Sequence, residues 1–382
     1  MGKRLLGIFL AAALLLCAVP VARAEGLEVA APSAVLMDAA TGTVLFEKNA
    51  REKLAPASVT KVMTLLLVME ALEDGRISWE DTVIASDAAA NKGGSQVYLE
   101  AGERMSMDEM LKSVVVSSAN DCATALAEHI AGSEAAFVEM MNQRAAELGM
   151  TDTHFVNCTG LDDEPNAAEH LTTAYDIALM SRELLKHEKI RDYTTIWMDT
   201  VRGGQFGLSN TNKLVRFYEG TTGLKTGYTS AAGHCLSATA KRDGIELIAV
   251  VMHCESSTDR FESAKAMLNY GFANYALVSA ETPEALPTVA VTLGKQSLIT
   301  PVLQSAAPIL ISKSEQSRVT KTVTMEETVT APVAAGQQLG TLTISAGDRI
   351  LAEIPIIAPE NVEKLTLWEL TVELLRRACM GQ

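Results

Sequence analysis

The feature that most restricts how this chain can fold is an almost wholly apolar run, residues 62–69, which follows a short segment opened by Pro56. Proline fits the first turn of a helix, so we predict a helix that starts there and ends near Asp74. On such a helix Ser58 and Lys61 share one face, within reach of a hydrogen bond. The helix N-terminus would also place free N–H groups and a partial positive charge near Ser58.

The hydroxyl of Ser58 is a possible nucleophile, and the neighbouring amine of Lys61 is a possible base that activates it. Serine is nearly inert at its own pKa, and a lysine in a poorly solvated pocket can lose its proton and act as the base. The apolar run after Lys61 supplies such surroundings. S-x-x-K is nevertheless a common string, so this interpretation depends on what the rest of the chain contains.

The N-terminus has the pattern of an export signal. Two basic residues precede the apolar residues 5–21, and residues 22–24, Ala-Arg-Ala, match a secretory cleavage site. We predict a signal peptide at residues 1–24 and a mature chain that begins at Glu25. A retained membrane helix is the alternative, which the short apolar run disfavours.

Charge and cysteine content exclude several classes of protein. The chain has 32 basic and 47 acidic residues, and removal of the three basic residues in the leader lowers the net charge to −18. This balance argues against nucleic acid as a partner. The five cysteines after the leader are odd in number and resemble small buried hydrophobic residues. Histidines and cysteines lack metal-ligand spacing, so we expect neither a zinc hydrolase nor a cofactor.

The pattern of periodicity predicts an α+β domain at residues 25–280. Strand-like runs occur at both ends, and the runs between them have helical periodicity. Strands are expected at residues 34–37, 43–46, 223–228, 234–240 and 246–253. Helices are expected at residues 107–116, 122–130, 133–148, 172–185 and 259–275, and residues 76–106 look irregular. The N-terminal hairpin and the later strands would then share one antiparallel sheet flanked by helices.

Two further segments follow this domain. Residues 281–287 are rich in Pro, Glu and Ala and mark a domain boundary. With this boundary segment included, residues 281–358 are predicted to form a small all-β domain that serves as a spacer or a binding surface. Residues 359–382 read as an amphipathic helix that could lie in a membrane interface, with Trp368 as anchor and Arg376 and Arg377 near headgroups. The alternative is a terminal helix packed on the β domain or in a dimer.

Three short motifs occur in a fixed order: Ser58-x-x-Lys61 at a helix start, Ser118-x-Asn120 in a loop, and Lys-Thr-Gly at residues 225–227 on a strand. The ordered trio resembles the penicillin-binding protein and serine β-lactamase superfamily. Nearly the whole mature chain is similar to the low-molecular-weight D-alanyl-D-alanine carboxypeptidases. The resemblance implies that family's fold, an antiparallel sheet with an inserted helical cluster.

The resemblance also implies a two-step acyl transfer. Ser58 would attack the D-Ala-D-Ala carbonyl of a peptidoglycan stem peptide, with Lys61 as general base. Ser118 matches the serine that relays a proton to the leaving amine. Lys225 would add a positive charge that helps to keep Lys61 neutral.

Substrate binding is assigned in the same way. Asn120 would hydrogen-bond the substrate backbone, and Thr226 would bind its terminal carboxylate. Gly227 would let the substrate lie along the strand edge, and the Tyr228 N–H would complete an oxyanion hole with that of Ser58. Arg260 matches an arginine that assists carboxylate binding, although a surface role is equally open.

Two departures from the family pattern bear on specificity or rate: Ala119, where many relatives have glycine, and Thr211, where some have a substrate-binding arginine. We expect an exported carboxypeptidase at the outer face of the cytoplasmic membrane or in the cell wall. Its partners would be stem peptides, β-lactams as covalent inhibitors, and a membrane surface through residues 360–382. A D,D-endopeptidase, a β-lactamase and a non-hydrolytic wall-binding module are the alternatives.

Overall fold

The computed structural model describes residues 27–163, 166–282 and 284–380. The predicted signal peptide and its cleavage site lie outside the described residues. An antiparallel five-stranded sheet in the order β2-β1-β9-β8-β7 organises the first part of the chain. Its strands are β1 (Ser33–Asp38), β2 (Val44–Lys48), β7 (Thr221–Thr229), β8 (Gly233–Arg242) and β9 (Ile245–Cys254). The N-terminal hairpin and the three late strands therefore share one sheet, as expected.

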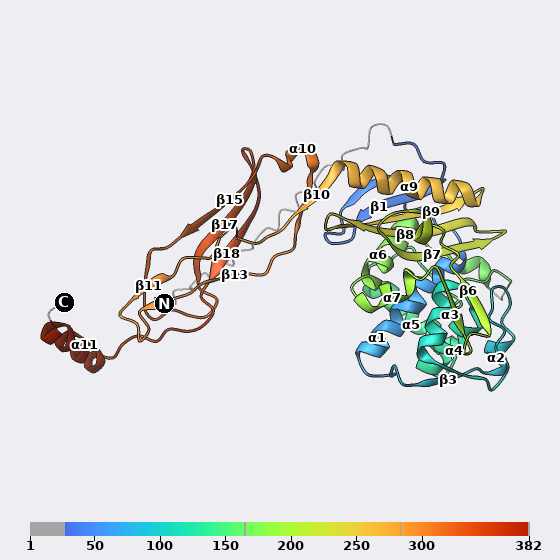
Figure 1. Ribbon diagram of the computed structural model, residues 1–382, viewed down its shortest axis with the longest axis horizontal. Helices are drawn as coiled ribbons and strands as arrows, with labels where there is room; N and C mark the ends of the chain where they lie inside the picture. The colour runs from blue at the N-terminus through green and yellow to red at the C-terminus, as the bar shows by residue number, and fades with distance from the viewer. Residues whose placement is uncertain (1–26, 164–165, 283, 381–382) are drawn as a thin grey trace, which may run out of the picture.

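Both faces of the sheet are buried, since successive side chains of a strand point to opposite faces. Val35 and Met37 of β1 pack into a core with α1 (Lys61–Glu73) and α6 (Ala174–Leu184), whereas Ala34 and Leu36 pack into a second core with α9 (Ser257–Asn274). Figure 1 shows α9 along one face of the sheet and α1, α6 and the helical cluster beneath the opposite face. The α+β prediction is confirmed.

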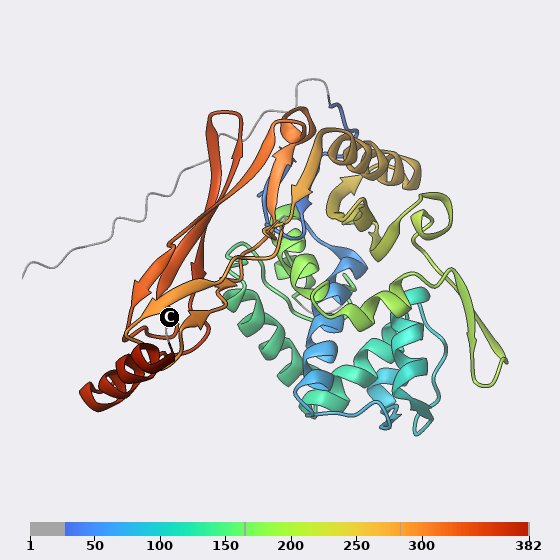
Figure 2. The same cartoon turned by 60° about the vertical axis from the view of Figure 1, so that its left-hand side comes forward.

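The helical cluster begins and ends close to the predicted residues. It comprises α3 (Met107–Val116), α4 (Asn120–Ala131) and α5 (Glu134–Glu147), with the short α7 (Arg191–Thr194) and α8 (Leu214–Phe217) before β7. The region expected to be irregular contains β3 (Thr82–Ile84), α2 (Asp87–Ala90) and β4 (Arg104–Ser106). A hairpin of β5 (Met198–Val201) and β6 (Phe206–Ser209) projects from the helices in Figure 2. Such short elements carry too few residues for a periodicity to be recognised.

The C-terminal part is an all-β domain with its own apolar cores. Its strands are β10 (Tyr275–Val278), β11 (Val289–Thr292), β12 (Leu298–Ile299), β13 (Val302–Leu303), β14 (Ile309–Ser312), β15 (Val319–Met325), β16 (Thr328–Thr330), β17 (Gln338–Ala346) and β18 (Arg349–Ile357), with a helical turn α10 (Lys313–Gln316). β10, which follows α9 directly, pairs with β14. The chain thus passes from the mixed part into the β domain along a strand.

The last helix, α11 (Leu367–Met380), lies at the end of the β domain that is farther from the five-stranded sheet in both views (Figures 1 and 2). Trp368 is 75% exposed, so the apolar stripe of this helix is largely open. None of the helices in the described part of the chain is long and apolar enough to cross a membrane. The expectation that the cysteines are buried is confirmed for Cys122, Cys158, Cys235 and Cys254. It is wrong for Cys379 on α11, which is exposed.

Candidate active site

Ser58 lies on a tight turn just before the helix α1. The turn is the 3₁₀ helix η1 (Ala57–Thr60), and α1 begins only at Lys61. Ala57 has φ of 48°, outside the right-handed helical region, so an α-helix cannot extend back through it. The predicted start at Pro56 was therefore too early. The predicted neighbourhood is nevertheless present, because Lys61 Nζ donates a hydrogen bond to Ser58 Oγ at 3.0 Å.

A loop far along the chain fixes the same lysine. Lys61 Nζ also donates to the carbonyl oxygen of Thr159 at 2.8 Å. The next residue, Gly160, has φ of 83°, and a Cβ there would lie 1.9 Å from the carbonyl oxygen of Ala57. Only glycine therefore allows this loop to approach the Ser58 turn. Thr159 was not predicted as a site residue, because a backbone carbonyl leaves no side-chain signal in a sequence.

The two lysines of the motifs, Lys61 and Lys225, are both buried. Burial lowers the pKa of Lys61 to about 7, although the Cys158 thiol and the Asp121 carboxylate act in the opposite direction. The pKa of Lys225 is also lowered, first by burial and then by the charges of Lys61 and Arg260. The depression at Lys61 thus follows mainly from the apolar surroundings, and the repulsion between the two lysines acts on Lys225.

The loop between α3 and α4 presents the second motif. Ser118 is buried, and its φ of 64° is a left-handed backbone conformation that residues other than glycine adopt only at a cost in free energy. Asn120 is the first residue of α4, two residues before the predicted helix start. Its side-chain amide donates to the carbonyl of Gly93 at 2.7 Å, and its backbone N–H donates to that of Ser95. Its Oδ1 is buried without a hydrogen-bond partner in the described structure, so it is available to an incoming donor.

The third motif runs along β7, an edge strand of the sheet. Thr226 Oγ1 donates to Thr211 Oγ1 at 2.6 Å, so Thr211 lies beside the proposed carboxylate ligand. A Cβ at Gly227 would lie 2.6 Å from the carbonyl oxygen of Pro56 and 3.1 Å from the backbone nitrogen of Ser58. The absent side chain therefore admits the Ser58 turn, whereas the sequence suggested that it admits substrate.

Two side chains flank the end of this strand. The ring of Tyr228 is 60% exposed and stacks on His234, with ring centroids 4.3 Å apart. Arg260 is buried, and its Nη1 donates to the carbonyls of Gly227 at 3.0 Å and Cys235 at 3.3 Å. Arg260 is thus no surface residue. It ties α9 to the strand that carries the motif, while direct contact with a substrate stays a prediction.

A buried histidine behind the Ser58 turn was also missed by the sequence reasoning. His170 Nδ1 accepts from the Val156 N–H at 3.1 Å, so its Nε2 carries the proton that faces Thr60 Oγ1 at 2.8 Å. Thr60 Oγ1 in turn donates to the Ala57 carbonyl. Burial lowers the pKa of His170 to about 4. Among the described residues there is no group of three or more His, Cys, Asp or Glu side chains suited to a metal ion.

Comparison with known proteins gives consistent matches. Residues 20–256 match the family described as peptidase S11, D-alanyl-D-alanine carboxypeptidase, and residues 274–364 match the penicillin-binding protein 5 C-terminal domain. The D-alanyl-D-alanine carboxypeptidase DacF of Bacillus subtilis (strain 168) is 42% identical over 374 residues, which cover 95% of each chain.

Solved structures agree with these sequence matches. Penicillin-binding protein 5 from Haemophilus influenzae superposes with a TM-score of 0.72 at 28% identity, covering 88% of this chain and 98% of that one. Penicillin-binding protein D2 from Listeria monocytogenes in its ampicillin-bound form gives 0.59 at 30% identity, covering 64% and 99%. The first match includes the β domain, so the similarity extends well beyond the motif-bearing part.

Proposed function

Because the chain belongs to the peptidase S11 family of D-alanyl-D-alanine carboxypeptidases, we propose that it removes the terminal D-alanine from peptidoglycan stem pentapeptides through an acyl-enzyme on Ser58. The contact between Ser58 Oγ and Lys61 Nζ at 3.0 Å carries this proposal. A lysine whose pKa is about 7 is neutral in about half of the molecules at pH 7 and can then act as a base. Among the described residues, the Ser58 hydroxyl is the only hydroxyl to which its Nζ donates.

The first step forms an ester and releases D-alanine. Neutral Lys61 takes the Ser58 proton while Oγ bonds to the carbonyl carbon of the D-Ala-D-Ala peptide bond. The N–H groups of Ser58 and Tyr228 stabilise the resulting oxyanion. The C–N bond then breaks, and Ser118 relays the proton to the leaving amine.

Binding groups lie on both sides of this centre. The unpartnered Oδ1 of Asn120 can accept a hydrogen bond from a substrate N–H. The hydroxyls of Thr226 and Thr211, which lie 2.6 Å apart, can receive the terminal carboxylate, and the buried Lys225 Nζ donates to the backbone carbonyl of Thr226. Arg260 supports this side by holding β7 in place.

The second step is hydrolysis of the ester, in which water attacks the acyl carbon and restores Ser58. A β-lactam has a reactive carbonyl in place of the peptide bond, so we propose that it acylates the same oxygen. The relative from Listeria monocytogenes has been solved in its ampicillin-bound form. A D,D-endopeptidase would use the same groups on a cross-linked peptide, and a β-lactamase would differ only in fast release of the penicilloyl ester.

The test is substitution of the proposed nucleophile. We expect Ser58→Ala to lose covalent labelling by fluorescent penicillin. The rate at which this variant releases D-alanine from a stem pentapeptide should fall by about 10³-fold or more. Retention of both activities by a folded variant would overturn the mechanism. Comparing the lifetime of the penicilloyl-enzyme with turnover on the peptide separates a carboxypeptidase from a β-lactamase.

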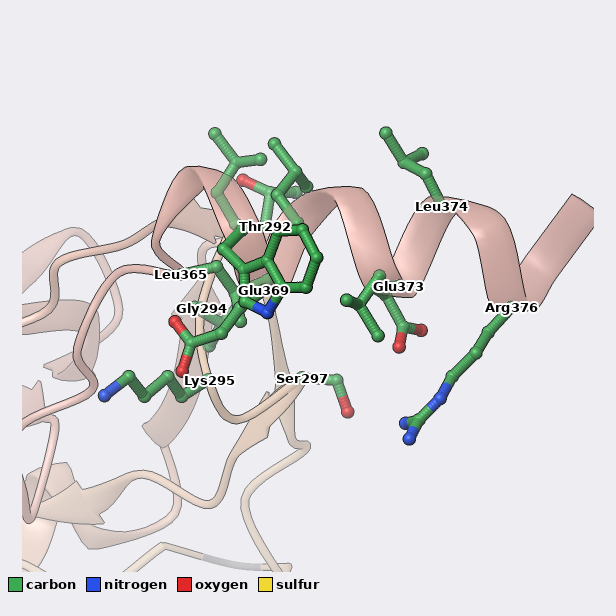
Figure 3. A pocket seen from close by; sticks show the side chains of 14 residues that line it. Thr292, Gly294, Lys295, Ser297, Leu365, Glu369, Glu373, Leu374 and Arg376 are labelled. Atoms are coloured by element: carbon green, nitrogen blue, oxygen red, sulfur yellow. The ribbon is translucent and has the colours of Figure 1, made fainter.

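We further propose that the exported protein is held at the outer face of the cytoplasmic membrane through α11. A cavity of about 790 Å³ lies between this helix and the β11–β12 turn, where Figure 3 shows Leu365 and Glu369 facing Lys295. The exposed Trp368 and Leu367 could enter a lipid interface. We expect the mature protein to float with liposomes and the chain lacking residues 360–382 to stay behind; equal recovery in the lipid fraction would contradict the proposal.

A further inference from the structure

The position of the proposed base depends on a segment with no regular structure. Residues 157–160 are neither helix nor strand, yet the Thr159 carbonyl is one of two hydrogen-bond acceptors of Lys61 Nζ. A shift of this carbonyl would let the lysine turn away from Ser58 Oγ. Displacements of about 1 Å in such positions can cost a hundredfold in rate. Whatever holds this segment therefore acts on the reacting pair.

One carboxylate outside the three motifs holds it. Glu134 begins α5, and its Oε1 accepts from both the backbone N–H and the Sγ of Cys158, each at 3.1 Å. Thr64, one turn beyond Lys61 on α1, donates to the Cys158 carbonyl. The residue directly before Thr159 is thus fixed on its N–H side by α5 and on its carbonyl side by α1.

The other oxygen of the same carboxylate binds the loop that holds Asn120. Glu134 Oε2 lies 2.7 Å from Lys92 Nζ, and the two side chains are only 21% and 13% exposed. Lys92 directly precedes Gly93, whose carbonyl accepts from the Asn120 side chain. Ser95 in the same loop accepts the Asn120 backbone N–H.

We propose that the Glu134–Lys92 ion pair is a positioning device that couples the loop behind Lys61 to the loop behind Asn120. The inference rests on the proposed function of those two residues. Neither member of the pair touches the reacting atoms. The pair instead sets the distance between the base and the substrate clamp by joining the two loops that hold them.

The electrostatics suit this role. Burial alone would raise the pKa of Glu134, but the hydrogen bond and charge of Lys92 and the bonds from Cys158 outweigh it, so the pKa is lowered and the carboxylate stays ionised. A weakly exposed pair is screened less by solvent and salt than a surface pair. Lys92→Met leaves the Glu134 carboxylate in poorly solvated surroundings without the cation of this pair, which destabilises the arrangement of its loop.

A second ion pair offers a matched control. Glu70 on α1 and Arg144 on α5 lie 2.8 Å apart at 19% and 22% exposure. This pair joins α5, the helix that also carries Glu134, to α1, but Glu70 is nine residues after Lys61 on α1, toward the end of the helix that is away from Ser58. Glu70→Gln should therefore lower the melting temperature without affecting the reaction.

The experiment uses the full mature chain and compares Glu134→Gln, Lys92→Met, the double variant and Glu70→Gln. We measure kcat and KM on a stem pentapeptide, the rate of acylation by fluorescent penicillin, and the melting temperature. We expect each single change at the pair to lower kcat and the acylation rate about tenfold or more, with a smaller rise in KM. The double variant should be no worse than either single variant, because one coupling is lost in all three.

Conservative changes complete the test. Lys92→Arg keeps the positive charge, so it should recover most of the acylation rate that Lys92→Met loses. If the pair contributed only to folding, the two variants would have the same acylation rate whenever their melting temperatures were equal. The inference is wrong if the pair variants match Glu70→Gln in rate, or if their effects add. If Glu134→Gln does not fold, Lys92→Met and Lys92→Arg decide the question alone. An inactive wild-type chain would instead refute the proposed function.

Discussion

The hydroxyl of Thr226 donates a hydrogen bond to the hydroxyl of Thr211 at 2.6 Å. Thr211 is held for this contact by its neighbours: Asn210 donates to the Ile196 carbonyl, and Asn212 donates to that of Gly223. Thr211, which departs from the pattern that the resemblance implies, is thus an uncharged group that contacts the motif threonine. The contact can be tested without altering charge.

We expect Thr211→Val to raise KM for a stem pentapeptide about fivefold, since one hydrogen bond contributes about 1 kcal/mol. The value of kcat should change little, because the contact lies away from the bond that breaks. Thr211→Ser retains the hydroxyl and serves as the control, with KM near that of the wild type. Equal KM values for the valine variant and the wild type would remove Thr211 from the binding site.

Lys61→Met should abolish acylation and at the same time stabilise the protein. The folded pKa of about 7 lies below the ordinary 10.5, so the unfolded chain binds more protons between these pH values. Wild-type stability therefore rises as pH increases from 7 to 10.5, and burial of the lysine is a cost at neutral pH. We expect the methionine variant to gain roughly 2 to 4 kcal/mol in unfolding free energy at pH 7.

Urea unfolding at a series of pH values checks this prediction. The stability gain of the Lys61→Met variant should shrink as the pH approaches 10.5, where the unfolded lysine also loses its proton. A variant no more stable than the wild type at neutral pH would show that Lys61 is well solvated.

His170 should make the protein sensitive to acid. Its folded pKa of about 4 lies below the ordinary 6.5, so protonation favours the unfolded chain in this interval. Stability is fully retained above pH 6.5 and falls by roughly 3 kcal/mol as the pH decreases toward 4. His170→Gln, which cannot titrate, should be less stable at pH 7 but should show a flatter dependence of melting temperature on pH.

The control for this change is the wild-type chain, measured over the same pH interval. An unchanged slope in the His170 variant would assign the acid sensitivity to other groups.

Gly160→Ala should be strongly destabilising, by about 3 kcal/mol or more. Its φ is 83°, and the added Cβ would meet the Ala57 carbonyl at 1.9 Å, so the loop must leave the Ser58 turn. Gly149→Ala is the matched control, because Gly149 has φ of 74° with open space around it. That change should cost only about 1 kcal/mol of backbone strain.

Chemical unfolding and penicillin acylation measured on both variants separate the two effects. We expect the Gly160 variant to lose acylation even where it is folded, and the Gly149 variant to keep it. Similar costs for the two substitutions would mean that the close approach of the loop to Ala57 contributes little.

The sequence alone determined the features that depend on neighbours along the chain. Helical periodicity located α3 at its observed residues, and the i, i+3 spacing brought Lys61 to Ser58 even though the turn between them is 3₁₀. Short apolar runs between turn residues predicted the late strands and the hairpin that share one sheet. These features follow from backbone geometry, which repeats over a few residues.

Only the tertiary structure decided what surrounds that pair. The Thr159 carbonyl at Lys61, the loop carbonyls at Asn120 and the burial of Arg260 all depend on segments that meet across large sequence separations. Backbone carbonyls look alike in every residue type, and a glycine with positive φ does not reveal which surface it will approach. The pKa of Lys61 likewise depends on how completely other segments exclude water from it, which local sequence does not encode.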